Sequence, residues 1–305
     1  EYKKERATVR LKELVGGALS FYAAAAVAKT GGVHIFVAED RDAAAYLLND
    51  FYNLLDEKQV YFFPSSYKRS AAYGAEDAQG VVQRTTAMNA VRGFTKGYLV
   101  VCTYPEALAE RVVDAATLQR DTIAVKLGDK ISIAVLEDAL ADANFTRVDF
   151  VYEPGQYSVR GGIVDVFSYS ESKPYRIDFF GDEVDSIRRF NISSQLSADK
   201  LDRVEIVPNL NAGEAPRVSF VQFAGSSATC WFYDADYVLR RVNDLRRKVL
   251  ADMEEPGQID RLLTSRNVLL RDMAGNSVVA LRDNLPERPA TAAVVFDTAP
   301  QPKFN

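Results

Sequence analysis

The sequence predicts a mixed α/β protein in which a small α+β domain with an antiparallel sheet is inserted into an α/β fold. Residues 1–116 alternate helical stretches with short apolar strands, which is typical of a parallel sheet covered by helices. Residues 152–190 instead contain consecutive strands with two-residue alternation, and helix and strand alternate again after residue 209. The length of 305 residues allows two or three domains. We place them at 1–116, 117–208 and 209–305.

Short apolar runs predict the strands of the first segment, at residues 34–38, 60–63 and 98–103. Ala-rich or amphipathic stretches predict its helices, at residues 17–29, 40–55 and 80–92. Asp40 or Asp42 is the expected N-cap of the second helix, because a short carboxylate accepts hydrogen bonds from the first backbone N–H groups. This segment is therefore expected to form a parallel α/β sheet.

The middle segment begins with a predicted helix over residues 133–143, and strands follow it. Along residues 175–180 one face is wholly apolar, whereas Arg176, Asp178 and Phe180 share the other. A turn at residues 181–183 leads into a strand on which strict alternation places Val184, Ser186 and Arg188 opposite Asp185, Ile187 and Arg189. An aromatic residue on a polar face is usually either covered by another element or exposed as part of an interface. Phe180 therefore makes this face a candidate binding surface.

The third segment predicts a strand over residues 229–233 and an amphipathic helix over residues 235–253. One face of this helix is basic, with Arg240, Arg241, Arg246, Arg247 and Lys248. Such a run is typical of a solvated helix face, and contact with DNA or a polymerase is the alternative.

Charge is unevenly distributed along the chain. Of its 37 basic and 42 acidic side chains, 11 and 16 lie in residues 117–208, which leaves 26 and 26 elsewhere. The whole negative excess therefore lies in the middle segment. Nucleic-acid affinity depends on cations that replace condensed counterions, so this composition favours a protein partner for that segment.

Cys102 and Cys230 lie in apolar runs, and we expect reduced, buried thiols. With His34 as the only histidine, neither a His-based metal cage nor a Ser-His-Asp triad can be assembled. No signal peptide and no apolar stretch of membrane-spanning length is present, which predicts a cytoplasmic location and no membrane partner. A chain that opens at Glu1 without Met suggests a fragment of a longer protein.

Two motifs resemble a known family. Residues 155–167 read GQYSVRGGIVDVF and residues 174–188 read PYRIDFFGDEVDSIR; softer matches lie at residues 62–66 and 100–108. Together they resemble the amino-terminal UvrB-homology module of the bacterial transcription-repair coupling factors (Mfd). The resemblance implies a UvrB-like module built from degenerate RecA/helicase-like α/β domains, with the small α+β domain inserted between them.

Related UvrB-like domains carry a phosphate-binding loop, G-x-x-x-x-G-K-S/T, in which backbone amides and the lysine bind phosphates. Residues 14–22 read LVGGALSFY here, without that lysine. Lys29 and Thr30 are adjacent, but at the carboxyl end of the predicted helix, where the dipole repels phosphate. Asp236 follows an apolar strand without completing an acidic pair. We expect no catalysis and no cofactor in this chain; ATP and magnesium would belong to motor domains of the full-length protein.

The resemblance also implies a binding partner, the excision-repair protein UvrA. The family's UvrA-contacting positions fall on Arg160, Arg176 and Phe180, and we add Arg188 and Arg189 as a possible rim of the same patch. The alternative is that the arginines only pair with Asp165, Asp178 or Asp182 within the sheet. In the full-length protein, the resemblance implies masking by its own carboxy-terminal domain, and contacts with RNA polymerase and DNA through regions absent here.

Two other functions remain open at this stage: a degenerate UvrB-like module that still binds DNA or hydrolyses ATP, and a purely structural scaffold. Residues 64–83 are too few for the long DNA-wedging hairpin of UvrB. Within them Tyr67, Lys68, Arg69 and Tyr73 combine aromatic and cationic groups that suit nucleic acid, although local packing of a surface loop is the favoured explanation.

Overall fold

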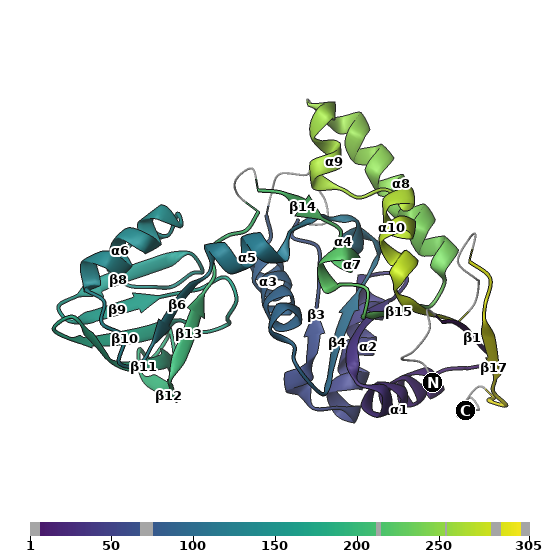
Figure 1. Ribbon diagram of the computed structural model, residues 1–305, viewed down its shortest axis with the longest axis horizontal. Helices are drawn as coiled ribbons and strands as arrows, with labels where there is room; N and C mark the ends of the chain where they lie inside the picture. Colours follow the sequence, from purple (N-terminus) through teal and green to yellow (C-terminus); the bar gives the residue numbers. More distant parts are fainter. Residues whose placement is uncertain (1–6, 68–75, 212–214, 254, 282–287, 300–305) are drawn as a thin grey trace. The chain divides into compact units, whose positions relative to one another are not determined.

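A computed structural model describes residues 7–67, 76–211, 215–253, 255–281 and 288–299 (Figure 1). The chain divides into two compact units. The larger unit combines Glu1–Gly80, Ala90–Val112 and Arg217–Asn305, and the smaller unit combines Val81–Asn89 and Val113–Pro216. One contains a parallel sheet and the other a mainly antiparallel sheet, so the predicted fold class is confirmed.

The larger unit is built on a seven-stranded sheet in which every pairing is parallel. Its strand order is β17 (Ala292–Val295), β1 (Thr8–Lys12), β16 (Ser277–Ala280), β15 (Thr229–Phe232), β2 (Gly32–Val37), β4 (Tyr98–Thr103) and β3 (Val60–Phe62). Strands from the two ends of the chain are thus neighbours: Val9 is opposite Ala292, and Cys230 is opposite Ile35. The first and third predicted segments contribute strands to one sheet.

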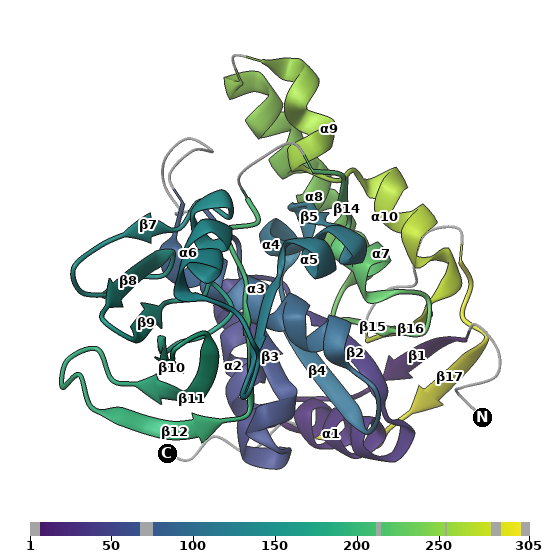
Figure 2. The same cartoon turned by 60° about the vertical axis from the view of Figure 1, so that its left-hand side comes forward.

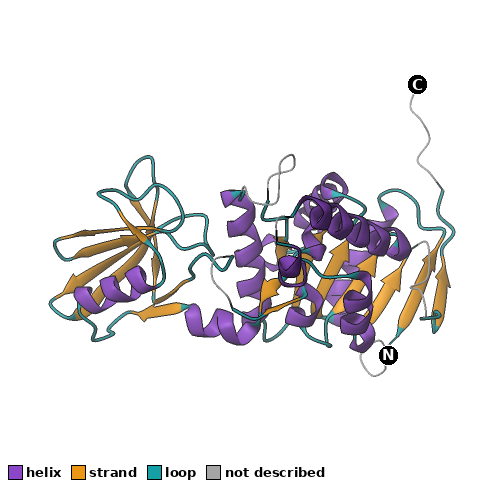
Figure 3. Ribbon diagram, turned by 90° about the horizontal axis from the view of Figure 1, so that it is seen from above, coloured by secondary structure: helices purple, strands orange, loops and turns teal. Residues whose placement is uncertain are grey.

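Helices α1 (Ala18–Thr30) and α2 (Arg41–Leu54) pack against this sheet (Figure 3). The other helices of the larger unit are α4 (Pro105–Ala109), α7 (Phe220–Ala224), α8 (Ala235–Asp252), α9 (Ile259–Leu262) and α10 (Arg266–Asp272), of which α4, α9 and α10 contact α8. Helix α3 (Ala78–Gly93) contains residues of both units. Short 3-10 turns lie at Glu57–Gln59, Pro256–Gln258 and Met273–Gly275, and two two-residue strands, β5 (Val112–Val113) and β14 (Arg217–Val218), pair with each other.

The helix ends follow the capping residues. The Asp40 carboxylate accepts a hydrogen bond from the Ala43 N–H at 2.8 Å, which confirms Asp40 as the N-cap of α2. Helix α1 ends at Thr30, and Gly31 follows with φ 59°, a conformation that glycine adopts without strain. The Lys29–Thr30 pair is therefore at the carboxyl end of α1, as expected.

Aromatic residues fill the core between β2, β15 and α2. The ring centroids of Phe36 and Trp231 are 4.8 Å apart in a stacked arrangement, and Phe51 lies 4.7 Å from Phe36 on its other side. The Trp231 indole N–H donates to His34 Nδ1 at 3.1 Å, so the hydrogen of the neutral imidazole is on Nε2, 3.1 Å from the Gly31 carbonyl. The only histidine of the chain thus links two neighbouring strands in the core.

Both cysteines are buried in this sheet without a disulfide, Cys102 on β4 and Cys230 on β15. Burial raises the pKa of Cys230 to about 12 and raises that of Cys102 still further. A raised thiol pKa favours the protonated form, so neither thiolate forms near neutral pH. We expect both thiols to resist a disulfide reagent at pH 8 in the native protein and to react rapidly in denaturant; rapid labelling of either native thiol would contradict this placement.

The smaller unit is built on a six-stranded sheet with a helix on one face (Figure 2). The strand order is β12 (Ser197–Leu201), β11 (Glu183–Phe190), β10 (Tyr175–Phe180), β9 (Ile163–Val166), β8 (Gln156–Arg160) and β7 (Thr146–Arg147), antiparallel except between β7 and β8. A separate antiparallel pair joins β6 (Ile123–Lys126) to β13 (Arg203–Ile206), and helices α5 (Ala115–Asp121) and α6 (Ile133–Asp142) complete the unit. Leu136 and Leu140 of α6 belong to one buried cluster with Val164, Val166 and Ile177 of the sheet.

The strict alternation expected along residues 184–189 is confirmed from Ser186 to Arg189 and is wrong for Val184 and Asp185. Val184 pairs with Phe179 and Ser186 with Asp178, so Asp185 is an extra residue that forms a bulge. As a result Val184 and Ile187, three positions apart, both lie in the core. The bulge thus moves Val184 to the core face, while Arg188 and Arg189 lie on opposite faces, as alternation predicts.

Candidate partner-binding face

The sheet of the smaller unit has a second face, opposite the core that α6 covers. Among the residues that strand register places on it, eight form what we call the polar face: Ser158, Arg160, Asp165, Arg176, Asp178, Phe180, Ser186 and Arg188. Ile163, opposite Arg160, and Glu183, opposite Phe180, lie on the same side of the sheet. Asp165 of β9 is the centre of one row, opposite Ser158 on one side and Arg176 on the other, and Arg188 continues that row. Three predicted residues, Arg160, Arg176 and Phe180, therefore lie on one face.

Asp165 connects the two predicted arginines. Its side chain is only 1% exposed, and its carboxylate accepts hydrogen bonds from Arg160 Nη2 at 2.6 Å and from Arg176 Nε and Nη2 at 2.7 and 2.9 Å. A buried carboxylate loses its hydration, and these charged donors replace it. The pairing with Asp165 that was considered as an alternative is therefore present for both arginines.

Arg176 is held on several sides. Beyond its bonds to Asp165, it donates to the Gln195 carbonyl at 3.2 Å and to the Gln195 side-chain oxygen at 3.4 Å. Its guanidinium lies 4.4 Å from the ring centre of Phe190, a cation–π contact, and its side chain is 14% exposed. Hydrogen bonds to Asp165 raise the pKa of Arg176 above its ordinary value, although burial opposes them. The arrangement fits a residue that positions the face more than one that offers a free guanidinium.

Arg160 and Phe180 are more accessible. The Arg160 side chain is 36% exposed, and its guanidinium lies 4.8 Å from the ring centre of Phe150, itself half exposed. Phe180, at the end of β10, is 84% exposed and is the most exposed large apolar side chain among the described residues. A phenylalanine in water loses the favourable free energy of burial, roughly 1.5–3 kcal/mol. Its exposure indicates a surface that a partner covers.

The two possible rim residues, Arg188 and Arg189, lie on opposite faces of the sheet. Arg188 lies on the polar face and pairs with the Asp178 carboxylate, which also accepts from the Ser186 hydroxyl. Arg189 is opposite Tyr175, a core residue, and donates to Glu171 at 3.2 Å. The structure thus brings Arg188, and not Arg189, into the neighbourhood of Arg160, Arg176 and Phe180.

Several contributors to the face were not singled out in the sequence. Phe190, Phe167 and Val151 form a small buried cluster under the Arg176 guanidinium, and Gln195, with φ 57°, supplies two of its acceptors. Leu196, the next residue, is 70% exposed. Phe190 is two residues beyond Arg188, and its contact with Arg176 depends on the pairing of β10 with β11.

The positively charged residues of α8 are largely paired. Arg240 is bonded to Asp236, Arg241 to Glu106, Arg246 to Asp260 and Arg247 to Asp244. Asp234, which follows β15, accepts a hydrogen bond from the Tyr237 N–H at 2.8 Å and caps α8. Lys68, Arg69 and Tyr73 lie outside the described residues. Four of the five basic residues that the sequence left open for DNA contact thus pair with carboxylates.

The described part of the chain contains no group of three or more His, Cys, Asp or Glu side chains placed to hold a metal ion. None of its helices combines the length and apolarity that a membrane crossing requires. The polar face therefore offers recognition chemistry: charged donors, a fixed carboxylate and exposed aromatic rings.

Comparison with known proteins identifies the smaller unit. Residues 123–211 match the UvrB interaction domain family. The chain is 27% identical over 199 residues to the transcription-repair-coupling factors of Bacillus subtilis and of Escherichia coli, which covers 65% of this chain and 17% of each relative. The corresponding Haemophilus influenzae protein is 35% identical over 101 residues, or 33% of this chain and 9% of the relative. The expected relationship is confirmed, and the chain spans about a sixth of the length of the first two relatives.

Proposed function

We propose that this chain, a homologue of the transcription-repair-coupling factors that contains a UvrB interaction domain, is a non-catalytic module that binds UvrA through the polar face of its smaller unit. In this role it would bring the excision-repair protein to stalled RNA polymerase during transcription-coupled repair. Contacts with polymerase and DNA, and masking by a carboxy-terminal domain, would belong to other parts of a longer protein.

The exposure of Phe180 beside Arg160 supports this proposal most strongly. Interfaces concentrate their binding energy in a few aromatic and arginine residues, surrounded by contacts that exclude water. On the polar face the exposed ring of Phe180 would be the anchor, and Arg160 would pair with a carboxylate of the partner. Because Asp165 fixes Arg160 and Arg176 in advance, little side-chain entropy is lost when the partner binds.

The competing function, a module that binds DNA or hydrolyses ATP, has less support. The negative excess lies in the middle segment, and the loop before α1 lacks the phosphate-binding lysine. No ATP or magnesium is assigned to this chain.

A direct test mixes the purified chain with UvrA and measures complex formation by calorimetry, in parallel with ATP hydrolysis and with DNA binding at two salt concentrations. We expect saturable UvrA binding, no ATP turnover, and no salt-dependent DNA binding. Salt-sensitive DNA binding or ATP turnover without UvrA binding would support the competing function, and absence of all three would support a scaffold.

A further inference from the structure

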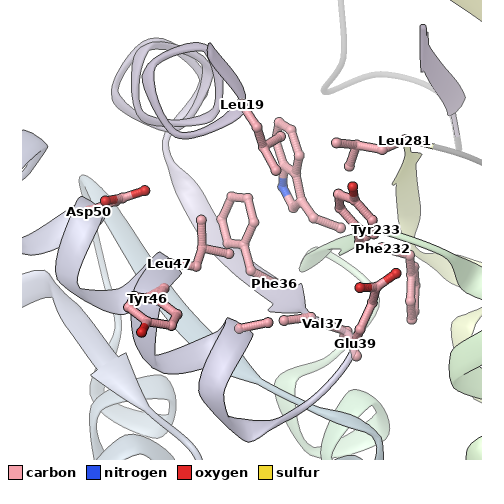
Figure 4. A pocket seen from close by; sticks show the side chains of 13 residues that line it. Leu19, Phe36, Val37, Glu39, Tyr46, Leu47, Asp50, Phe232, Tyr233 and Leu281 are labelled. Atoms are coloured by element: carbon pink, nitrogen blue, oxygen red, sulfur yellow. The ribbon is translucent and has the colours of Figure 1, made fainter. Parts of the chain in front are cut away.

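The larger unit contains a cavity of about 330 Å³, and none of its lining residues belongs to the polar face (Figure 4). It lies between α1, α2 and the sheet, and continues past the last residues of β2 and β15. Its volume falls within the range of small-molecule sites, which begins at roughly 300 Å³. Nothing in the partner-binding proposal uses it.

The position of the cavity in the sheet topology is that of a ligand site. From β2 the chain crosses through α2 toward β3, whereas from adjacent β15 it crosses through α8–α10 in the opposite direction, toward β16. Crossovers between parallel strands are right-handed, so opposite directions put the connecting helices on opposite faces. The chain leaves β2 and β15 on different sides, and open parallel sheets bind ligands outside the carboxyl ends of such a strand pair.

The lining defines the chemistry of the ligand. Five aromatic residues contribute to the walls, together with aliphatic groups of α1 and α2: Phe36, Tyr46, Trp231, Phe232 and Tyr233. Tyr46 is 77% exposed, which places an aromatic ring at the solvent side of the cavity. The walls thus suit an apolar body of a few atoms to a single ring.

Charge on the lining has one sign. Glu39 follows β2 and Asp50 lies on α2, each half-buried, and Asp50 accepts a hydrogen bond from Ser20 of α1. Among the described residues that line the cavity there is no Lys, Arg or His. Among the described lining residues, a phosphate or carboxylate would meet two negative charges and no cation, whereas a positively charged group would meet two carboxylates and aromatic faces.

We propose that this cavity is a binding site for a small organic cation with an apolar or aromatic body, such as an aromatic amine. The apolar part would occupy the space that Phe36, Leu47 and Trp231 line. The ammonium group would lie toward Glu39 or Asp50.

The chain provides its own reporter for this site. Trp231 is the only tryptophan and lines the cavity, so its emission responds to occupancy. We would titrate the 305-residue chain with 2-phenylethylamine, with 3-phenylpropionate as an anion of similar size, and with ATP. The expected result is saturable quenching by the amine with a dissociation constant of roughly 0.1–1 mM, which is ordinary for so few atoms. The carboxylate and ATP should leave Trp231 emission unchanged.

Three variants locate the binding. Glu39→Gln and Tyr46→Ala should each weaken the amine by about three- to tenfold, the loss expected for one partly desolvated charge or one cation–π contact. Tyr52→Ala is the matched control, since Tyr52 is a half-exposed tyrosine of the same helix that does not line the cavity. Equal binding of amine and carboxylate, saturable binding of ATP, no response to the amine, or equal loss in all three variants would each overturn the proposal.

Discussion

Replacing Asp165 by alanine is expected to lower the free energy of unfolding of the smaller unit by about 3–5 kcal/mol, the usual effect of leaving a buried charge without its partner. Two guanidiniums converge on this carboxylate, and Arg176 is 14% exposed. Without Asp165, Arg176 retains Gln195 and the Phe190 ring but loses its only hydrogen-bonded anion among the described residues. The two like charges of Arg160 and Arg176 then also face each other unscreened.

The measurement is denaturant unfolding of the chain followed by two probes. Far-UV circular dichroism reports on both units, whereas Trp231 fluorescence reports on the larger unit alone, because the smaller unit contains no tryptophan. Asp165→Ala should move the circular-dichroism transition and move the Trp231 transition much less. Asp178→Ala is the matched control, since Asp178 pairs with one partly exposed arginine and its loss should cost only about 1 kcal/mol. If both substitutions lowered the free energy of unfolding by the same small amount, Asp165 would not be the main stabilising carboxylate of the polar face.

Phe180→Ala is expected to weaken UvrA binding by about 2 kcal/mol or more, which corresponds to roughly 30-fold or more in the dissociation constant. The ring is 84% exposed, so its removal takes away interface area while leaving the packing of the unit intact. Stability should therefore stay within about 0.5 kcal/mol of the original chain, as for other surface substitutions.

Val135→Ala is the matched control for this prediction. Val135 is also an exposed apolar residue of the smaller unit, at 58%, but it lies on α6, which packs on the opposite face of the sheet. Its removal should leave UvrA binding unchanged. Loss of binding in Val135→Ala, or full binding in Phe180→Ala, would place the interface elsewhere.

Arg176→Ala is a poorer test than Phe180→Ala, because it does not distinguish a residue that contacts the partner from one that only stabilises the face. Because Arg176 neutralises buried Asp165, its removal should weaken UvrA binding through disorder of the face even if the partner never touches it. Arg160 is the better probe of direct charge pairing, since more of its side chain is exposed.

Local elements were predictable because each rests on a few neighbouring residues. The apolar runs of β2 and β4, the Asp40 cap of α2, and the alternation of β10 all appear where the sequence indicates. The grouping of Arg160, Arg176 and Phe180 on one face follows from the same alternation, together with the pairing of β8, β9 and β10.

Features that depend on distant residues were not predictable in this way. Asp165 looks like one more charged residue of an alternating strand, and only the register with Arg176 and the nearby Arg160 shows that it is buried. The bulge at Asp185 puts Val184 on the core face, and no periodicity marks it. The pairing of β15 with β2 joins residues about 200 positions apart, and it also creates the cavity beside Trp231.

The central claim is that the polar face, and not another surface of the chain, contacts UvrA. Amide hydrogen exchange of the unmodified chain with and without UvrA tests it most directly, because the experiment needs no substitution that could disturb the fold. We predict slower exchange in peptides that cover the β8–β9 turn at residues 160–163 and the β10–β11 turn at residues 179–183, with no change in α6. Protection confined to α6 or to the larger unit would contradict the account.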